Sequence, residues 1–255
     1  MNPTVLTEVR GDVLVITLNR PEAKNSINHE LAVALARAFE LLDETAGVRA
    51  GVLTGAGTDF CAGMDLKAFA SGAPLPEVNG KGLAGLGKSA PRKPLVAAVE
   101  GHAVAGGFEL VLSCDLIVAA ENARFGLPEV KRGLIAAGGG IVRLARMVPR
   151  NLAMGLLLTG EVLEVEEMRG FGLLNEVTPL GTTVDAAVDL ARRISANAPR
   201  AVEETKSLFL AAGDLSTAAA FDLVDRATPG ILGSADALEG ATAFAEKREP
   251  RWTGR

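Results

Sequence analysis

Two glutamates and a pair of adjacent glycines are the residues in this sequence best suited to chemistry. Glu109 follows Gly106 and Gly107, and a second carboxylate, Glu129, follows Pro128 further along the chain. The residues around Glu109 are almost all apolar, and a carboxylate in such surroundings is costly unless it has a partner. Burial also raises a carboxyl pKa toward the range useful for proton transfer. The two glutamates therefore indicate general acid–base chemistry.

Each glutamate taken alone also has a purely structural explanation. An acidic residue in the first turn of a helix stabilises that helix, which would account for Glu109. Glu129 stands directly after a proline, and a proline followed by an acidic residue is a common way to begin a helix. The residue types alone leave both explanations open.

Backbone N–H groups are the second candidate for chemistry. Gly106 and Gly107 precede a helix predicted over 108–113, and the free N–H groups at a helix start favour negative charge. An enolate or oxyanion gains roughly 3 kcal/mol from each such donor. In the segment 60–66, Ala62 and Gly63 permit close approach of another molecule to the backbone. The same segment also fits a tight turn with Asp65 near a helix cap.

Other chemistries find little support in the sequence. There is no G-x-S-x-G motif and no tyrosine, and the only histidines are His29 and His102. We expect His29 to be solvated at a helix start and His102 to be structural rather than the base of a triad. The turn at 55–57 begins like a dinucleotide fingerprint, but Phe60 occupies the position of its last glycine.

The composition restricts the class of protein. The chain has 255 residues, of which 48% are hydrophobic and 22% charged, as in a globular domain with a sizeable core. A net charge of −5 argues against binding to nucleic acid or to a membrane surface through basic residues. Cys61 and Cys114 lie in apolar surroundings, as expected of reduced thiols, and no cysteine or histidine spacing indicates a metal site.

Two further features bear on location. The N-terminal stretch lacks the basic and apolar regions of a signal peptide, so we expect a cytoplasmic protein. The apolar segment 95–120 is long enough to span a bilayer, but it contains Glu100, Glu109 and Asp115. Each charge near a bilayer centre costs roughly 3 kcal/mol, so we expect this segment to form a soluble core.

Strands and helices alternate up to about residue 130, which predicts an α/β fold. The segments 4–9 and 12–18 form a predicted hairpin, and Asn28 is the predicted N-cap of a helix over 29–45. Further strands are expected at 49–53, 95–99, 116–119 and 175–178, and further helices at 139–147, 150–158, 165–170, 182–196, 200–211, 216–228 and 234–247. Residues 71–94, rich in glycine and proline, are expected to be a mobile surface loop. A core domain over 1–195 and a helical region over 196–255 are predicted.

Taken in order, several segments resemble the enoyl-CoA hydratase/isomerase (crotonase) family along essentially the whole chain. Each motif alone is weak, but an ordered run of this number is specific. The matching segments are Phe60–Leu66 (F-x-A-G-x-D-L), Gly101–Leu110 (G-x-a-x-G-G-G-x-E-L), Cys114–Ala119, Phe125–Glu129, Gly133-Leu134, Gly138–Gly140, Leu158–Gly160 and Gly172–Val177.

The resemblance implies an α/β fold of the crotonase (ClpP-like) type, a spiral of β-β-α turns whose helical C-terminal region assembles trimers or hexamers. It implies an oxyanion hole formed by the backbone N–H groups of Met64 and Gly106. The residues implied to bind coenzyme A are Ala62, Gly63, Asp65 and Leu66 beside its arm, and Ala23, Lys24 and Ile27 near its adenine. It implies no cofactor, since coenzyme A is part of the acyl-CoA substrate.

Carboxylates at both family positions favour an enoyl-CoA hydratase, a lyase of the fatty-acid β-oxidation type. Glu109 is expected to deprotonate the water that adds at Cβ, and protonated Glu129 to help deliver a proton to Cα. An enoyl-CoA isomerase, or a dehydratase of a substituted acyl-CoA similar to carnitinyl-CoA dehydratase, is the alternative on the same fold. A non-catalytic scaffold that binds coenzyme A is the alternative of another class.

Some positions depart from the family pattern. Phe108 and Met64 are bulkier than the small residues often found there, which would reshape the acyl pocket, and Phe108 also occurs in relatives resembling carnitinyl-CoA dehydratases. Ala136-Ala137 and Ile141-Val142 replace a Pro-Gly and a Thr-Gln pair. The segment 71–94 is expected to line the acyl tunnel.

Overall fold

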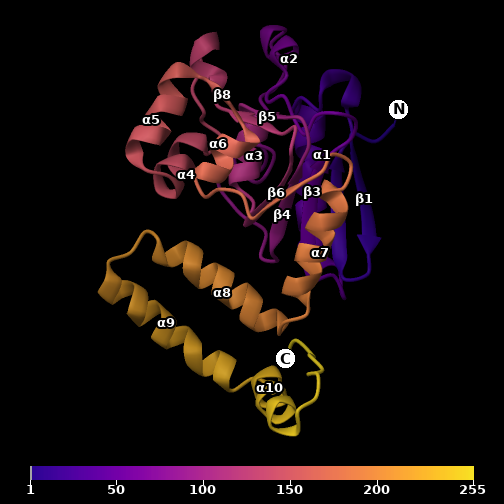
Figure 1. The fold of residues 1–255 in the computed structure, drawn as a ribbon, viewed down its shortest axis with the longest axis vertical. Helices are drawn as coiled ribbons and strands as arrows, with labels where there is room; N and C mark the ends of the chain where they lie inside the picture. The colour runs from indigo at the N-terminus through magenta and orange to yellow at the C-terminus, as the bar shows by residue number, and fades with distance from the viewer. Residues whose placement is uncertain (1) are drawn as a thin grey trace.

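A six-stranded sheet forms the centre of the computed structural model, which describes residues 2–255. The sheet order is β1-β2-β3-β4-β6-β9, and only the pair β1–β2 is antiparallel (Figure 1). The strands are β1 (Val5–Arg10), β2 (Val13–Leu18), β3 (Ala50–Gly55), β4 (Leu95–Val99), β6 (Leu116–Ala120) and β9 (Glu176–Thr178). The predicted hairpin and the predicted α/β class are confirmed.

Helices cover both faces of this sheet. Residues alternate across a strand, so Leu14 and Ile16 of β2 join the cluster that contains α1 (His29–Glu44), whereas Val13 and Val15 face the other way. The second cluster is completed by Ala187, Val188 and Ala191 of α7 (Thr183–Ser195). Strand β4 is apolar and buried along its whole length, and β3 and β6 nearly so, as is typical of parallel strands covered on both faces.

A second, three-stranded sheet was not predicted. It consists of β5 (His102–Val104), β7 (Arg124–Gly126) and β8 (Val162–Glu164). Residues 102–104 were expected to be part of a glycine-rich turn, and that expectation is wrong. A three-residue strand is too short to show an alternating pattern. The order β4, β5, α3 and then β6, β7, η2 gives the β-β-α turns of the predicted spiral.

Short helices connect the strands of the two sheets. Helix α3 begins at Gly106, two residues before its predicted start, and α4 packs against it (Figure 1). These short helices are η1 (Pro21–Ala23), α2 (Leu66–Ala70), α3 (Gly106–Leu112), η2 (Pro128–Arg132), α4 (Gly140–Met147), α5 (Arg150–Thr159) and α6 (Val165–Gly170). No helix among residues 2–255 is both long and apolar enough to cross a bilayer.

The segment 71–94 is not the mobile surface loop that its composition predicts. It forms no named helix or strand, yet Val78, Leu83, Ala84 and Leu86 are buried. Its backbone also bonds to itself, for example from the Ala84 N–H to the Pro76 carbonyl at 2.8 Å. The buried positions follow neither a helical nor a strand period, so the pattern of the sequence could not reveal their burial.

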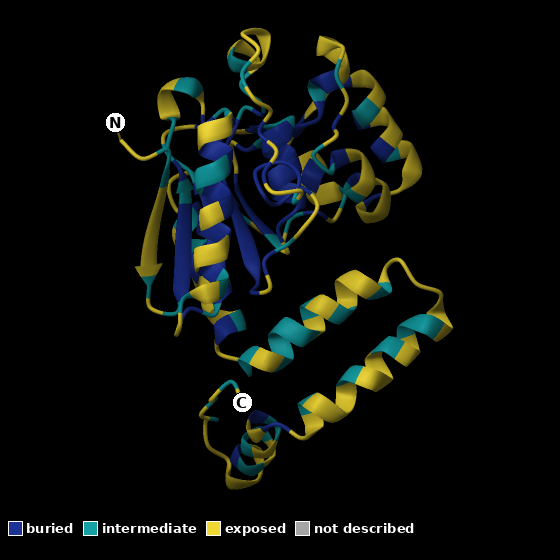
Figure 2. Ribbon diagram, turned by 180° about the vertical axis from the view of Figure 1, so that it is seen from behind, coloured by how far each residue is buried: buried dark blue, intermediate teal, exposed yellow. Residues whose placement is uncertain are grey.

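Three helices at the C-terminal end lie apart from the sheets. These are α8 (Pro199–Ala212), α9 (Thr217–Leu232) and α10 (Ala235–Glu246). Helices α8 and α9 pack against each other, and all their residues are half-buried or exposed (Figure 2). Helix α9 continues four residues beyond its predicted end at 228, with Pro229 inside its last turn. The division of the chain at residue 195 stays a prediction.

Candidate active site

Glu109 lies on α3, all of whose residues are buried, and its own side chain is buried with them. The Gly140 N–H donates a hydrogen bond to Glu109 Oε1 at 2.9 Å. Burial raises the pKa of Glu109, whereas the N–H groups of residues 138–140 and the positive charge of Arg143 act in the opposite direction. This carboxyl group is therefore buried but has donors that stabilise its charged form.

Three successive glycines make this contact possible. A Cβ on Gly138 would lie 2.6 Å from Glu109 Oε2, and one on Gly140 would lie 3.1 Å from Oε1. A Cβ on Gly139 would collide with the guanidinium of Arg143. The glycine turn thus fits between the carboxyl group of Glu109 and the guanidinium of Arg143.

Glu129 lies in η2, directly after Pro128, and only 8% of the residue is exposed. Both of its carboxyl oxygens are buried, and neither has a hydrogen-bond partner among residues 2–255. Burial, with a contribution from the nearby charge of Glu109, raises the pKa of Glu129 to about 7. A buried carboxyl group without a donor favours its protonated form.

The two carboxyl groups therefore differ in a way that suits acid–base catalysis. Glu109 accepts a backbone hydrogen bond that stabilises a carboxylate, and Glu129 has no such donor within the described chain. Environments that separate two carboxyl pKa values assign one group to the base role and the other to the acid role. Here Glu109 fits the base and Glu129 the acid.

The backbone N–H of Met64 is directed away from its neighbouring segment. Ile27 pairs with Met64 in a parallel bridge, in which the Ile27 N–H bonds to Gly63 O at 2.8 Å and the Asp65 N–H to Ile27 O at 3.0 Å. In a parallel pairing the central residue's own N–H points to the opposite side. A Cβ on Gly106 would lie 3.5 Å from Met64 N, so that opposite side is where α3 begins.

A second backbone N–H, that of Gly106, lies near the N–H of Met64. Gly106 is the first residue of α3, and the N–H of a first helical residue has no acceptor within the helix. A Cβ on Gly63 would lie 3.1 Å from Gly106 N and 2.7 Å from the Ala105 Cβ, so the glycine keeps this space open. Ala105 has φ 50° and ψ −128°, a conformation that costs a residue other than glycine about 1–3 kcal/mol. Strain of this kind occurs at functional sites.

The segment implied to bind coenzyme A lies beside these N–H groups. The Ala62 N–H bonds to Lys24 O at 2.9 Å, which joins residues 23–27 to residues 61–65. Lys24 is exposed, and its ammonium lies 3.6 Å from Asp59 Oδ2. The other residues of this prediction are Ala23 at the end of η1, Ala62 and Gly63 before Met64, Asp65 as the N-cap of α2, and Leu66, 42% exposed, as its first residue.

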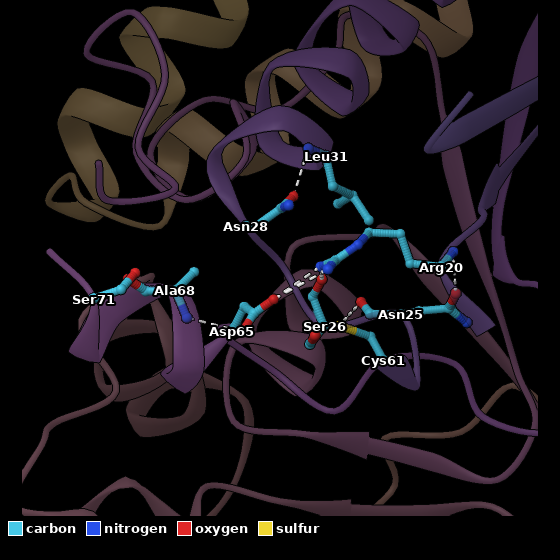
Figure 3. A network of polar contacts seen from close by, with 9 residues as sticks. All are labelled: Arg20, Asn25, Ser26, Asn28, Leu31, Cys61, Asp65, Ala68 and Ser71. Atoms are coloured by element: carbon cyan, nitrogen blue, oxygen red, sulfur yellow. Dashed lines mark hydrogen bonds and ion pairs between the residues drawn. The ribbon is translucent and has the colours of Figure 1, made fainter. Parts of the chain in front are cut away.

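An ion pair that the sequence did not reveal braces this segment. Arg20 donates from both terminal nitrogens to Asp65 Oδ2, at 3.2 and 3.1 Å, and also to Ser26 O at 2.5 Å (Figure 3). The buried Asn25 side chain accepts from the Arg20 N–H and donates to the carbonyls of residues 56 and 59. Arg20 belongs to none of the predicted motifs. Asn25 lies within residues 23–27, but nothing in the pattern of the sequence indicated these contacts of its side chain.

The histidines and cysteines take structural places around this arrangement, and the Cys61 thiol donates to the Asn25 carbonyl at 3.1 Å (Figure 3). His102 Nδ1 lies 2.6 Å from Asp59 Oδ1, which supports the structural role predicted for it. His29 is exposed as predicted, although its Nδ1 also lies 3.0 Å from Leu75 O. Cys61 and Cys114 are buried free thiols, and burial raises the pKa of Cys61 to about 12 and that of Cys114 still further above the usual value.

Phe108 and Met64, the two bulky residues expected to reshape an acyl pocket, differ in their surroundings. The ring of Phe108 is fully buried and packs against Phe125 with ring centroids 5.5 Å apart, so it belongs to the core. Met64 instead lines a small hollow with Ile27 and Phe69. Of the two residues expected to reshape an acyl pocket, Met64 is the one that borders a hollow.

Comparison with known proteins gives a consistent result. Residues 8–255 match the enoyl-CoA hydratase/isomerase family. The chain is 39% identical to an enoyl-CoA hydratase, EchA19, of Mycobacterium tuberculosis, covering 99% of this chain and 97% of that protein. It is 38% identical to a carnitinyl-CoA dehydratase of Proteus mirabilis, over the full length of both.

Solved structures agree with this result. The structure of the enoyl-CoA hydratase EchA1 from Mycobacterium marinum superposes with a TM-score of 0.95 at 51% identity, over the full length of both chains. The fold is that of the crotonases, and the predicted resemblance is confirmed. On sequence and fold together, the chain belongs to the enoyl-CoA hydratase/isomerase family.

Proposed function

We propose that this protein is an enoyl-CoA hydratase that adds water across the double bond of a trans-2-enoyl-CoA. The observation that carries the proposal is the difference between its two buried carboxyl groups. Glu109 accepts a hydrogen bond from the Gly140 N–H, whereas both oxygens of Glu129 are buried without a partner among residues 2–255. A hydration needs one group to accept a proton from water and another to donate one to carbon.

In the proposed reaction, the N–H groups of Met64 and Gly106 bind the thioester oxygen. Their donors stabilise the negative charge that develops there, by roughly 3 kcal/mol each. Ala62, Gly63, Asp65 and Leu66 lie beside the arm of coenzyme A, and Ala23, Lys24 and Ile27 near its adenine. The exposed ammonium of Lys24 suits the phosphates of that part of the ligand.

In the proposed reaction one carboxyl group accepts a proton and the other donates one. Glu109 takes a proton from water while the water oxygen bonds to Cβ, and the double-bond electrons move toward the thioester oxygen. Protonated Glu129 then gives its proton to Cα as the carbonyl re-forms, and the proton on Glu109 restores Glu129. The reverse sequence is a dehydration. No cofactor is needed beyond the coenzyme A of the substrate.

A second candidate reaction uses the same groups. Relatives at 38% identity over the full chain are carnitinyl-CoA dehydratases, which makes dehydration of a substituted acyl-CoA the alternative. An isomerase on the same fold and a scaffold that binds coenzyme A without turnover are the others. A trimer or hexamer is proposed as the assembly, because Phe209, Phe221 and Phe244 of the C-terminal helices expose 65–87% of their surface.

The test is to replace Glu109 and Glu129 separately by glutamine and to assay hydration of crotonyl-CoA. Each change removes a proton transfer, so we expect kcat to fall by about 100-fold or more. Glu121→Gln, the same change at an exposed position, is the matched control and should leave kcat unchanged. Near-normal kcat in Glu109→Gln or Glu129→Gln would contradict the proposal.

Calorimetric titration with acetoacetyl-CoA separates the alternatives. Binding together with hydration supports the hydratase. Binding without turnover of crotonyl-CoA supports the scaffold, and turnover of carnitinyl-CoA in preference to crotonyl-CoA supports the dehydratase. Absence of binding would contradict all of them.

A further inference from the structure

The side chain of Leu83 lies against two glycines of the candidate site. A Cβ on Gly106 would lie 3.3 Å from Leu83 Cδ2, and a Cβ on Gly138 would lie 2.7 Å from the same methyl group. Gly106 carries one of the proposed oxyanion N–H groups, and Gly138 contacts the carboxyl group of Glu109. The methyl group of Leu83 thus lies between the proposed oxyanion hole and the proposed base.

The segment that carries Leu83 is held in place on several sides. The N–H groups of Leu86 and Gly87 both donate to Leu83 O, at 2.9 and 3.1 Å. Arg143 Nη1 donates to Gly87 O at 2.9 Å, and a Cβ on Gly85 would lie 2.6 Å from the Ala36 Cβ of α1. Leu83 itself is 8% exposed. These contacts connect the segment to α1 and α4 and keep Leu83 against the glycines.

An acyl chain bound in the proposed manner meets this side chain. Its thioester oxygen accepts hydrogen bonds from the N–H groups of Met64 and Gly106, and its Cα and Cβ lie within reach of the two glutamates. In this binding mode Gly106 and Gly138 flank the reacting carbons, so we expect the carbons beyond Cβ to meet the buried methyl group of Leu83. A close-packed site accepts added methylenes only where atoms move away.

We propose that Leu83 is a specificity-determining residue that ends the acyl pocket and restricts the enzyme to short-chain enoyl-CoA substrates. This inference rests on the proposed function, because it takes the thioester to be bound at Met64 and Gly106. Removing the side chain beyond Cβ opens the pocket to longer chains, and the partial truncation Leu83→Val opens it less.

The experiment compares kcat/KM for crotonyl-CoA and trans-2-decenoyl-CoA in the wild type, Leu83→Ala and Leu83→Val. Methylene-scale changes in an apolar pocket alter selectivity by about 10-fold or more. We expect the wild type to prefer crotonyl-CoA, and the decenoyl-to-crotonyl ratio to rise about 10-fold in Leu83→Ala and less in Leu83→Val. Leu86→Ala, the same truncation of a buried leucine in the same segment, should leave the ratio unchanged.

The outcomes distinguish this inference from the proposed function. A wild type that prefers decenoyl-CoA, or a ratio in Leu83→Ala equal to that of the wild type, would overturn the role of Leu83 while leaving the hydratase intact. If the wild type hydrates neither substrate, the proposed function fails, and titration with butyryl-CoA and decanoyl-CoA tests the pocket by binding alone. Should Leu83→Ala not fold, the ratio in Leu83→Val decides.

Discussion

Glu109 and Glu129 are both buried, and the charge of Glu109 contributes to the raised pKa of Glu129. Only Glu109 receives a backbone hydrogen bond, from the Gly140 N–H, whereas Glu129 has no partner among residues 2–255. Once one of two interacting carboxyl groups is ionised, the second resists ionisation. The unequal hydrogen bonding decides that Glu109 ionises first.

This relationship predicts a bell-shaped pH dependence of kcat/KM for crotonyl-CoA. The rate should rise with pH as Glu109 becomes a carboxylate and fall through about pH 7 as Glu129 loses its proton. Because the groups interact, the two apparent pKa values belong to the pair. The profile is measured from about pH 5 to pH 9, and a rate that stays constant above pH 7 would contradict the acid role of Glu129.

The same shift predicts a pH-dependent stability. The pKa of Glu129 is about 7 in the folded chain against a usual value of 4.5, so the folded state holds more protons between these values. The contribution of Glu129 to the free energy of unfolding therefore decreases as pH rises from 4.5 to 7. The glutamine in Glu129→Gln does not titrate, so this loss of stability is absent. The variant should therefore be more stable than the wild type at alkaline pH by up to about 3 kcal/mol.

Urea denaturation at acid and alkaline pH measures this effect. The exposed control Glu121→Gln should follow the wild type at both pH values. A constant stability difference between Glu129→Gln and the wild type, independent of pH, would show that Glu129 is not held protonated.

The glycine turn gives a steric prediction. In Gly138→Ala the new Cβ would lie 2.6 Å from Glu109 Oε2 and 2.7 Å from Leu83 Cδ2, so the carboxyl group must move. A displacement of about 1 Å in a catalytic group costs about 100-fold in rate. Gly155→Ala in α5, where no atom lies within 4 Å of the new Cβ, should keep full activity. Crotonyl-CoA hydration checks both variants, and kcat within about threefold of wild type in Gly138→Ala would refute this role of the turn.

The elements that the sequence predicts well are those long enough to show a period. Helix α1 and its N-cap are an example: Asn28 Oδ1 accepts from the Leu31 N–H at 2.9 Å, as its residue type indicates. The three strands of the second sheet have three residues each, too few for any alternation. The first of them, β5, leads directly to the candidate site, so its position there could not be derived from pattern alone.

Some residues of the candidate site could be predicted from the sequence, and others could not. The two glutamates and the glycines stand out by residue type among apolar neighbours, and their burial agrees with the prediction. Leu83 is one leucine in a segment of mixed composition, and only the folded chain brings it against Gly106 and Gly138. Long-range contacts of this kind have no signature in a single sequence.

Arg20 and Asp65 are the clearest case, because they are 45 positions apart and form a largely buried pair. Burial acts to raise the pKa of Asp65, but the hydrogen bonds from the Ala68 N–H and from Arg20 hold it below its usual value. The pair joins the turn before Ile27 to the residue that follows Met64. We therefore expect it to position the Met64 N–H.

Double-mutant analysis of Arg20→Met and Asp65→Asn tests this role. Each change should lower kcat for crotonyl-CoA by about 10-fold, because the proposed oxyanion donor loses its alignment. The double variant should be no slower than either single one, since both remove the same interaction. Arg20→Lys should recover only part of the rate, because an ammonium cannot bind with two nitrogens.

The exposed pair of Arg10 with Asp185 provides the matched control. Arg10→Met breaks an arginine–aspartate contact far from the site and should leave kcat unchanged, since exposed pairs contribute little. If Arg20→Met lowers the free energy of unfolding but keeps normal kcat, the pair stabilises the fold without positioning the N–H. If the rate losses of the two single variants multiply in the double variant, Arg20 and Asp65 act independently, and the coupling through Met64 is wrong.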